Sequence, residues 1–191
     1  MAFLIQYFYV VGACQFAMEG VHLLVTLSHG ITRVWKKWLM LAIGWGLPLL
    51  ISVIAIIIAT DGYGPPSPLQ KFCWLSFKIG TWWSMHIPIG LVQLFGIVCV
   101  IVIGVLQNRV KDSSDEEEYK TFKSNFVAFV CVLILYIVTW LFAFMELDPF
   151  KTKMPYLFLI FHALLGIVIS LLYCTLNYQV RLKLKTKISP N

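Results

Sequence analysis

Long stretches without a charged residue place the strongest limit on the folds that this chain can adopt. Four such stretches run from Trp38 to Thr60, from Ile79 to Asn108, from Ser124 to Met145 and from Met154 to Val180. A fifth apolar segment, residues 1–32, contains Glu19 as its single charged side chain. Each segment exceeds the roughly 20 apolar residues that a helix needs to cross the hydrocarbon layer of a membrane. The sequence therefore predicts five membrane-spanning helices.

Composition agrees with lipid as the solvent. Hydrophobic residues make up 60% of the chain and charged residues 13%, whereas a soluble domain carries about 25% charged residues. A transmembrane barrel would instead show alternating segments of about ten residues. We therefore expect an all-α integral membrane protein with spans at about residues 3–28, 38–60, 80–107, 124–145 and 155–178.

The Lys and Arg residues between the spans predict the orientation of the chain. One side of the membrane collects eleven of them, namely Arg33, Lys36, Lys37, Arg109, Lys111, Lys120, Lys123, Arg181, Lys183, Lys185 and Lys187. The other side collects Lys71, Lys78, Lys151 and Lys153. Because cytoplasmic loops carry the excess of basic residues, we expect the N-terminus outside and residues 181–191 as a basic cytoplasmic tail. Basic residues that flank apolar runs suit lipid headgroups, so we expect no nucleic-acid partner.

Polar side chains within the spans are candidates for a network between helices. A carboxylate at mid-bilayer costs on the order of 2.5–3.5 kcal/mol on insertion scales, so Glu19 is expected to face other helices. His22 follows three residues later on the same helix face. We therefore assign Glu19, His22 and His162 to an interhelical polar network. For Glu19 and His22, two roles are possible: a polar contact that only holds helices together, or a conformational switch. For His162, an interior histidine with its hydrogen bonds satisfied is an alternative.

The sequence lacks the motifs typical of enzymes. It contains no H-E-x-x-H, no G-x-S-x-G and no P-loop, so we expect no enzymatic activity. Its five cysteines form no C-x-x-C pair, and we expect no metal and no cofactor.

Six short motifs, in order along nearly the whole chain, resemble those of family B G-protein-coupled receptors. They are Glu19-Gly20-Val21-His22-Leu23, Gly44-Trp45-Gly46-Leu47-Pro48, Cys73-Trp74-Leu75-Ser76, Trp83 with Pro88, Thr139-Trp140-Leu141-Phe142, and Cys174 with Asn177 and Gln179-Val180-Arg181. The third and fifth motifs favour the adhesion branch over the peptide-hormone branch. Leu172-Tyr173-Cys174 is also similar to the hormone branch.

The resemblance implies that residues 1–180 correspond to helices three to seven of a seven-helix bundle. We therefore expect a truncated or fragmentary form of a receptor. In this family a loop cysteine pairs with a cysteine at the outer end of the third helix. Cys73 matches the loop position, and we expect it to be unpaired within this chain because the partner position would precede Met1. His162, Leu165 and Gly96 stand where the family commonly has polar amides.

The resemblance also implies a function: G-protein-coupled signalling at the plasma membrane. In the adhesion branch the agonist is often a tethered segment of the receptor itself, bound in the outer half of the bundle. Carried over to this chain, the candidates that line the ligand pocket are Trp74, Trp83 and Trp140. Packing or an interfacial belt also suits each of these side chains. The candidates that face a heterotrimeric G protein, or the headgroups, are Arg33, Lys36, Lys37 and Arg181.

A second hypothesis is a membrane protein that does not signal. It would associate with full-length receptor chains or be an inert fragment. Co-purification with a full-length relative without signalling would favour this hypothesis. A transporter is disfavoured because no pair of Gly- or Pro-broken helices occurs in matching halves of the sequence.

Overall fold

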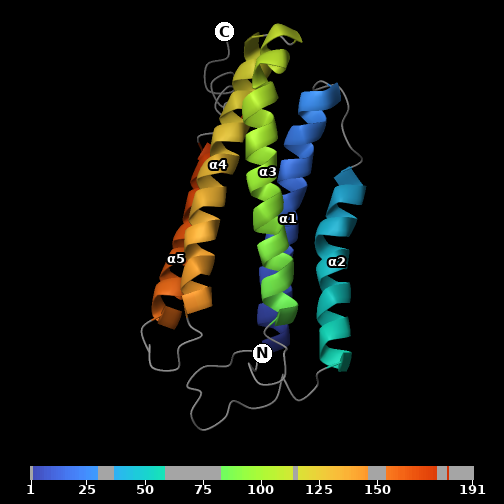
Figure 1. The fold of residues 1–191 in the computed structure, drawn as a ribbon, viewed down its shortest axis with the longest axis vertical. Coiled ribbons are helices and arrows are strands. Elements are labelled where there is room, and N and C mark those ends of the chain that lie inside the picture. The colour runs from blue at the N-terminus through green and yellow to red at the C-terminus, as the bar shows by residue number, and fades with distance from the viewer. Residues whose placement is uncertain are drawn as a thin grey trace, which may run out of the picture. The chain divides into compact units, whose positions relative to one another are not determined.

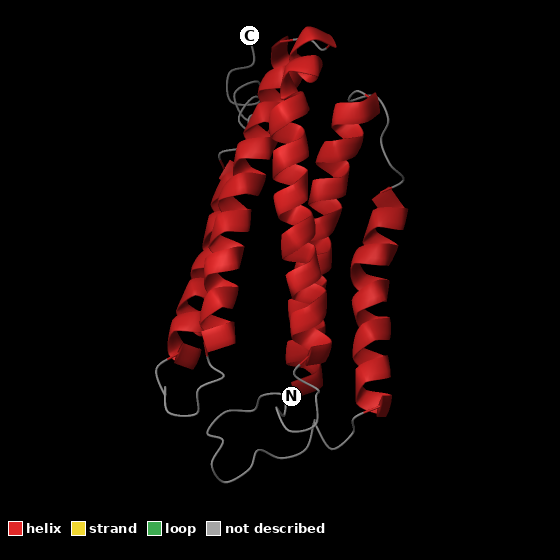
Figure 2. Cartoon of the chain, in the orientation of Figure 1, coloured by secondary structure: helices red, strands yellow, loops and turns green. Residues whose placement is uncertain are grey.

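The computed structural model describes residues 2–29, 37–58, 83–113, 116–145, 154–175 and 180, and these segments are helical (Figure 2). The elements are α1 (Ala2–His29), α2 (Lys37–Ile58), α3 (Trp83–Ser113), α4 (Glu116–Met145) and α5 (Met154–Ser170), followed by the π-helical turn η2 (Leu171–Thr175). Within the described part, five helices are long and apolar enough to cross a membrane. The predicted all-helical fold with five spans is therefore confirmed.

Helix α4 begins well before its charge-free stretch. Three acidic residues, Glu116 to Glu118, occupy its first turn, where they complement the partial positive charge of a helix N-terminus. One turn further on, Lys120 Nζ forms an ion pair with Glu116 Oε1 at 2.7 Å. Glu116 to Glu118 therefore form a polar N-terminal extension of the apolar helix α4. Residues 114–115 lie outside the described part.

The chain divides into two compact units. Unit 1 comprises Met1–His22 and Arg33–Val98, and unit 2 comprises Leu23–Thr32 and Cys99–Asn191. Helices α1 and α3 therefore each contribute their first part to unit 1 and their last part to unit 2.

In unit 1, α2 runs antiparallel to α1 (Figure 1) and buries a narrow stripe of small side chains. The four buried positions of α2 are Gly44, Pro48, Ser52 and Ala55. Their spacing of three or four residues places them on one face of the helix. The rest of α2 exposes large apolar side chains, as expected for a helix surrounded by lipid on its other faces.

In unit 2, α4 packs against α5 (Figure 1). The buried residues of α4 follow a helical period and are Phe122, Ala128, Phe129, Val132, Leu133, Tyr136, Thr139, Trp140 and Ala143. From α5, Phe158 and Leu165 are buried, while most of its other apolar side chains are exposed.

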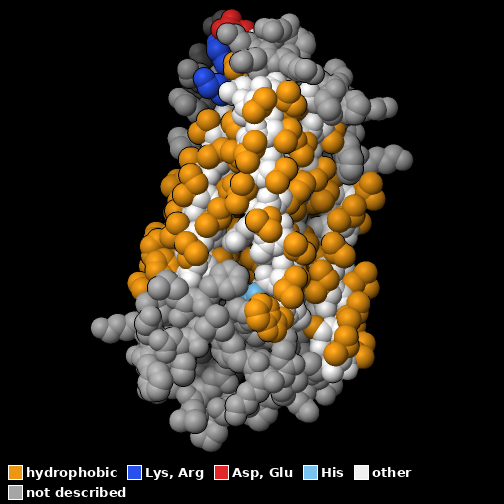
Figure 3. Space-filling model, in the orientation of Figure 1, with side chains coloured by type: hydrophobic (Ala, Val, Ile, Leu, Met, Phe, Trp, Pro, Cys, Tyr) orange, Lys and Arg blue, Asp and Glu red, His pale blue; other side chains and the backbone are white. Residues whose placement is uncertain are grey.

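The exposed surface of the described helices is mainly hydrophobic. Figure 3 shows hydrophobic side chains over the visible face of the helices, with acidic and basic side chains gathered at the end where α4 begins. Such a surface is stable in lipid and not in water.

Candidate functional site

Trp140 is the centre of an aromatic cluster in unit 2. Its side chain is 0% exposed. On α4, Tyr136 lies one turn before it, with ring centroids 6.2 Å apart in an edge-on arrangement. Between these two residues, Thr139 Oγ1 donates to the Leu135 carbonyl at 2.7 Å. This bond satisfies a buried hydroxyl within the helix itself, which leaves the adjoining face of α4 to the aromatic rings.

Helix α5 supplies the other side of this cluster. Phe158 meets Trp140 edge-on with ring centroids 5.4 Å apart, and His162 lies against Phe158 at 5.5 Å. Further contact between the helices comes from Phe142 and Phe161, whose centroids are 4.8 Å apart. Edge-on aromatic pairs contribute about 0.5–1.5 kcal/mol each beyond the area that they bury. The cluster therefore fixes how α4 sits on α5.

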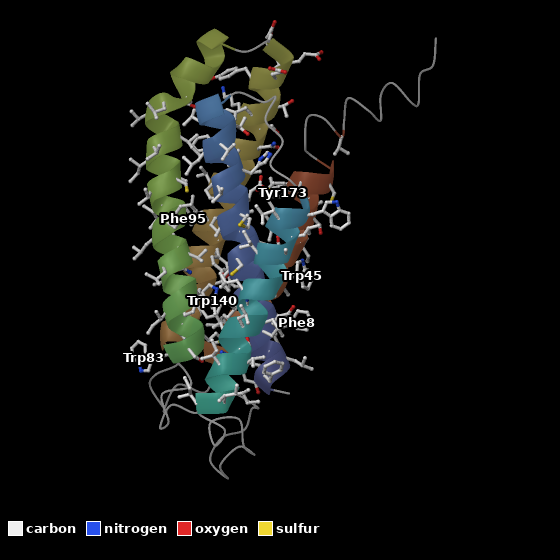
Figure 4. All side chains as sticks on the ribbon, turned by 90° about the vertical axis from the view of Figure 1, so that its right-hand side faces the viewer. Phe8, Trp45, Trp83, Phe95, Trp140 and Tyr173 are labelled. Atoms are coloured by element: carbon white, nitrogen blue, oxygen red, sulfur yellow. The ribbon has the colours of Figure 1, made fainter. Side chains whose placement is uncertain are left out.

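The other two candidate pocket tryptophans differ from Trp140. Trp83 is the first residue of α3, its side chain is 56% exposed, and Figure 4 shows it projecting from the end of the helix. Trp74 lies outside the described residues. An exposed indole at a helix end suits an interfacial position or a bound ligand equally well, so the role of Trp83 stays a prediction.

The predicted polar network is divided between the two units. Glu19 and His22 are on α1 in unit 1, where Glu19 is half-buried and His22 is exposed. His162 is on α5 in unit 2, next to Phe158. The ring contact of His162 places it in the aromatic cluster, a role that the sequence did not indicate.

A polar contact that the sequence reasoning missed joins α1 to α3 within unit 1. Gln6 is fully buried, and its Nε2 donates to Ser84 Oγ at 2.9 Å. The available signal was a glutamine inside an apolar span, which carries a polar group that needs a partner in lipid. His86, also on α3, is buried as well.

Several sequence candidates fall outside the described helices or at their ends. Arg33, Lys36, Arg181 and Cys73 lie outside the described residues, and Lys37 is the first residue of α2.

Five apolar helices, charged residues gathered at a helix end and interhelical aromatic and polar contacts define a multi-pass integral membrane protein. The sequence matches the family described as 7 transmembrane receptor (Secretin family) over residues 1–169. The chain belongs to this family, and the predicted resemblance is confirmed.

The similar proteins are adhesion receptors, which confirms the branch that the motifs favoured. The chain is 33% identical to Adhesion G-protein coupled receptor D1 of Bos taurus, over 98% of this chain and 21% of that protein. It is 32% identical to Adhesion G protein-coupled receptor E5 of Bos taurus, over 95% of this chain and 24% of the relative. It is also 30% identical to Cadherin EGF LAG seven-pass G-type receptor 1 of Homo sapiens, over 97% of this chain and 6% of the relative. The chain thus spans about a quarter or less of the length of these relatives.

Proposed function

We propose that the chain forms the larger part of the membrane-spanning signalling domain of an adhesion-type G-protein-coupled receptor in the plasma membrane. The match to the secretin-type receptor family over residues 1–169 carries this proposal. The relatives are named as receptors and not as enzymes, which supports a signalling function and the absence of a catalytic one.

Signalling in this proposal needs two further helices. The family is described by seven transmembrane segments, and the described part of this chain holds five helices that could span a membrane. The two additional helices come from the same polypeptide or from another receptor chain. They would cover part of the apolar surface that these five helices expose.

The agonist in this proposal is an apolar peptide segment, tethered or free. Its binding surface includes Trp74, Trp83 and Trp140, because aromatic faces bind apolar side chains well. Trp140 is fully buried against Tyr136 and Phe158. An agonist that reaches Trp140 must therefore separate it from Phe158, which would loosen α4 from α5.

The G protein in this proposal binds on the side of the membrane that carries the basic residues. Arg33, Lys36, Lys37 and Arg181 are the residues assigned to this surface. Their positive charge also suits anionic lipid headgroups. Neutralising these residues should therefore reduce G-protein coupling and also reduce the share of molecules that insert with this side in the cytoplasm, and the two effects need not be equal in size.

The test is complementation in cells. The chain is co-expressed with the first two helices of an adhesion receptor, and G-protein activation is followed by energy transfer between labelled G-protein subunits. We expect activation only when both polypeptides are present, and less activation from Trp140→Ala in the same assay. Co-purification of the two polypeptides serves as the control for assembly.

Assembly without activation would contradict signalling and favour the second hypothesis. In that case the chain would pair with receptor helices as a non-signalling partner. The large apolar side chains that the described helices expose are the observation that favours such pairing.

A further inference from the structure

One hydrogen bond ties the first part of α1 to the first part of α3 within unit 1. Gln6 Nε2 donates to Ser84 Oγ at 2.9 Å, and the Gln6 side chain is fully buried. Hydrogen bonds of this kind hold helices together in membranes, where hydrocarbon offers a polar side chain no partner. Loss of the bond would leave a buried amide donor in need of a new acceptor, which is unfavourable. The bond is therefore expected to restrain the start of α3.

A proline in the next turn of α3 removes backbone support from the same serine. Pro88 lies inside the helix Trp83–Ser113. In an α-helix the N–H of each residue bonds to the carbonyl four residues earlier, and proline has no N–H. Residue 88 therefore gives no helical bond to the Ser84 carbonyl. The residue that Gln6 holds from outside is thus the residue that the helix itself holds less firmly.

Helix α3 also has room to bend near this proline. Sharp bends in helices are concentrated at proline and at small residues. Gly90 follows Pro88 by two residues, and a Cβ atom added to it would meet nothing within 4 Å. On another face of the same turns, Met85 and Ile89 are fully buried. One face of α3 is thus packed while another is open, so the first turn can tilt about Pro88.

The first turn of α3 carries Trp83, the residue before Ser84. Its indole is more than half exposed and projects from the end of the helix (Figure 4). A tilt of this turn changes the direction in which the indole points, because the residues of one helical turn move together. Contacts of an aromatic ring depend on its geometry. The contacts that Trp83 can make with a ligand therefore depend on what restrains Ser84.

We propose that the hydrogen bond from Gln6 to Ser84 fixes the orientation of Trp83 by preventing the first turn of α3 from tilting about Pro88. Gln6 is then a positioning residue that acts on Trp83 through Ser84. The consequence for agonist binding rests on the proposed function, which assigns Trp83 to the agonist surface. The orientation of Trp83 does not rest on it, and the two parts are tested separately.

Fluorine NMR of the full chain in detergent micelles tests the orientation of Trp83. All seven tryptophans are replaced by fluorotryptophan, and Trp83→Phe identifies the Trp83 signal by its loss. We expect Gln6→Leu and Ser84→Ala each to move this signal, and the two substitutions together to move it no further than one alone. Ser84→Thr, which keeps the hydroxyl group, should leave the signal in place.

Two further variants separate this restraint from a general effect on stability. Gln93 is the matched control, because it is a second glutamine of unit 1 whose Nε2 is buried with no hydrogen-bond partner in the described part of the chain. Gln93→Leu should leave the Trp83 signal in place. Pro88→Ala restores an N–H at residue 88 and makes the first turn more firmly helical. In that background Gln6→Leu should move the Trp83 signal less than half as far.

The proposal is overturned if the Trp83 signal stays in place in both Gln6→Leu and Ser84→Ala. It is also overturned if Gln93→Leu moves the signal as far as Gln6→Leu does, or if Pro88→Ala leaves the effect of Gln6→Leu unchanged. Ser84→Ala removes the acceptor with a small change of volume, so it gives the same comparisons if Gln6→Leu does not fold.

The complementation assay tests the consequence for signalling. Gln6→Leu should lower G-protein activation by about 3- to 20-fold at an equal amount of chain in the membrane, the factor that corresponds to loss of one interhelical hydrogen bond. Trp83→Ala should lower activation as well, and Gln6→Leu should have little further effect in that background. Unchanged activation by Gln6→Leu would overturn the part of the proposal that concerns the agonist. No activation from the unsubstituted chain would contradict the proposed function itself, and the NMR result would still decide whether Gln6 orients Trp83.

Discussion

Trp140 contributes to stability through packing more than through removal from water. Its side chain is fully buried between Tyr136 and Phe158, and in a membrane the alternative environment is lipid, which is as apolar as the protein interior. The energetic value of the residue therefore lies in close contacts and in the edge-on ring geometry. The Thr139-Trp140 motif indicated a functional aromatic residue, but the sequence could not identify Phe158 and His162 as its neighbours, because those contacts depend on how α5 rotates against α4.

Replacement of Trp140 by alanine would leave a cavity between α4 and α5. Trp140→Ala should destabilise the chain by about 2 kcal/mol, below the roughly 3–5 kcal/mol of soluble cores, since the transfer term is small in lipid and the cavity term remains. Thermal loss of helical circular dichroism in detergent measures the change. Trp38→Ala is the matched control, because Trp38 is 83% exposed. A similar loss of stability for Trp140→Ala and Trp38→Ala would show that the contacts of Trp140 with its aromatic neighbours do not stabilise the chain.

The second prediction concerns the hydrogen bond from Gln6 to Ser84. Interhelical hydrogen bonds in membranes contribute about 0.6 kcal/mol on average and at most about 1.7 kcal/mol. A double-mutant cycle with Gln6→Leu and Ser84→Ala should give a coupling energy within that range, measured by reversible unfolding in mixed micelles. Additive effects of the two substitutions would mean that the 2.9 Å contact does not stabilise the pair.

At the scale of the element, sequence predicts the helices better than it predicts their faces. The charge-free stretches predict five apolar helices, because length and lack of charge are sufficient for a span. Helix α4 begins at Glu116, eight residues before the charge-free stretch that starts at Ser124, and lack of charge could not predict this polar first part. The buried face of α2 was not predictable, because its sequence is apolar all round and only four small residues mark the side that packs.

The faces of α4 allow a prediction with neighbouring residues as its control. Ala128 is 5% exposed and Val127 is 50% exposed. Ala128→Phe should destabilise the chain by about 1–3 kcal/mol through overpacking, whereas Val127→Phe should change stability little because lipid can move aside. Unfolding of both variants in detergent provides the comparison. A larger loss of stability for Val127→Phe than for Ala128→Phe would mean that the face of α4 with Val127, and not the face with Ala128, packs against protein.

At the scale of the whole molecule, the charge distribution predicts an orientation that the helices alone do not. With the five apolar helices of the described residues as the spans, their odd number predicts that the two ends of the given sequence lie on opposite sides of the membrane. Eleven Lys and Arg residues fall on the side of the C-terminus and four on the side of the N-terminus. The side with the excess is therefore predicted to face the cytoplasm, where each basic residue near an anionic surface gains about 1 kcal/mol.

Tags at the two ends test this orientation in living cells. An epitope placed before Met1 should bind antibody on intact cells, and an epitope placed after Asn191 should bind it only after the membrane is permeabilised. The distribution of charge predicts which end of the chain is outside the cell. The number of spans predicts only that the two ends lie on opposite sides of the membrane. Reversed accessibility would therefore contradict the charge argument alone. Accessibility of both ends from one side would contradict five spans, and with them the assignment of basic residues to a G-protein-facing surface.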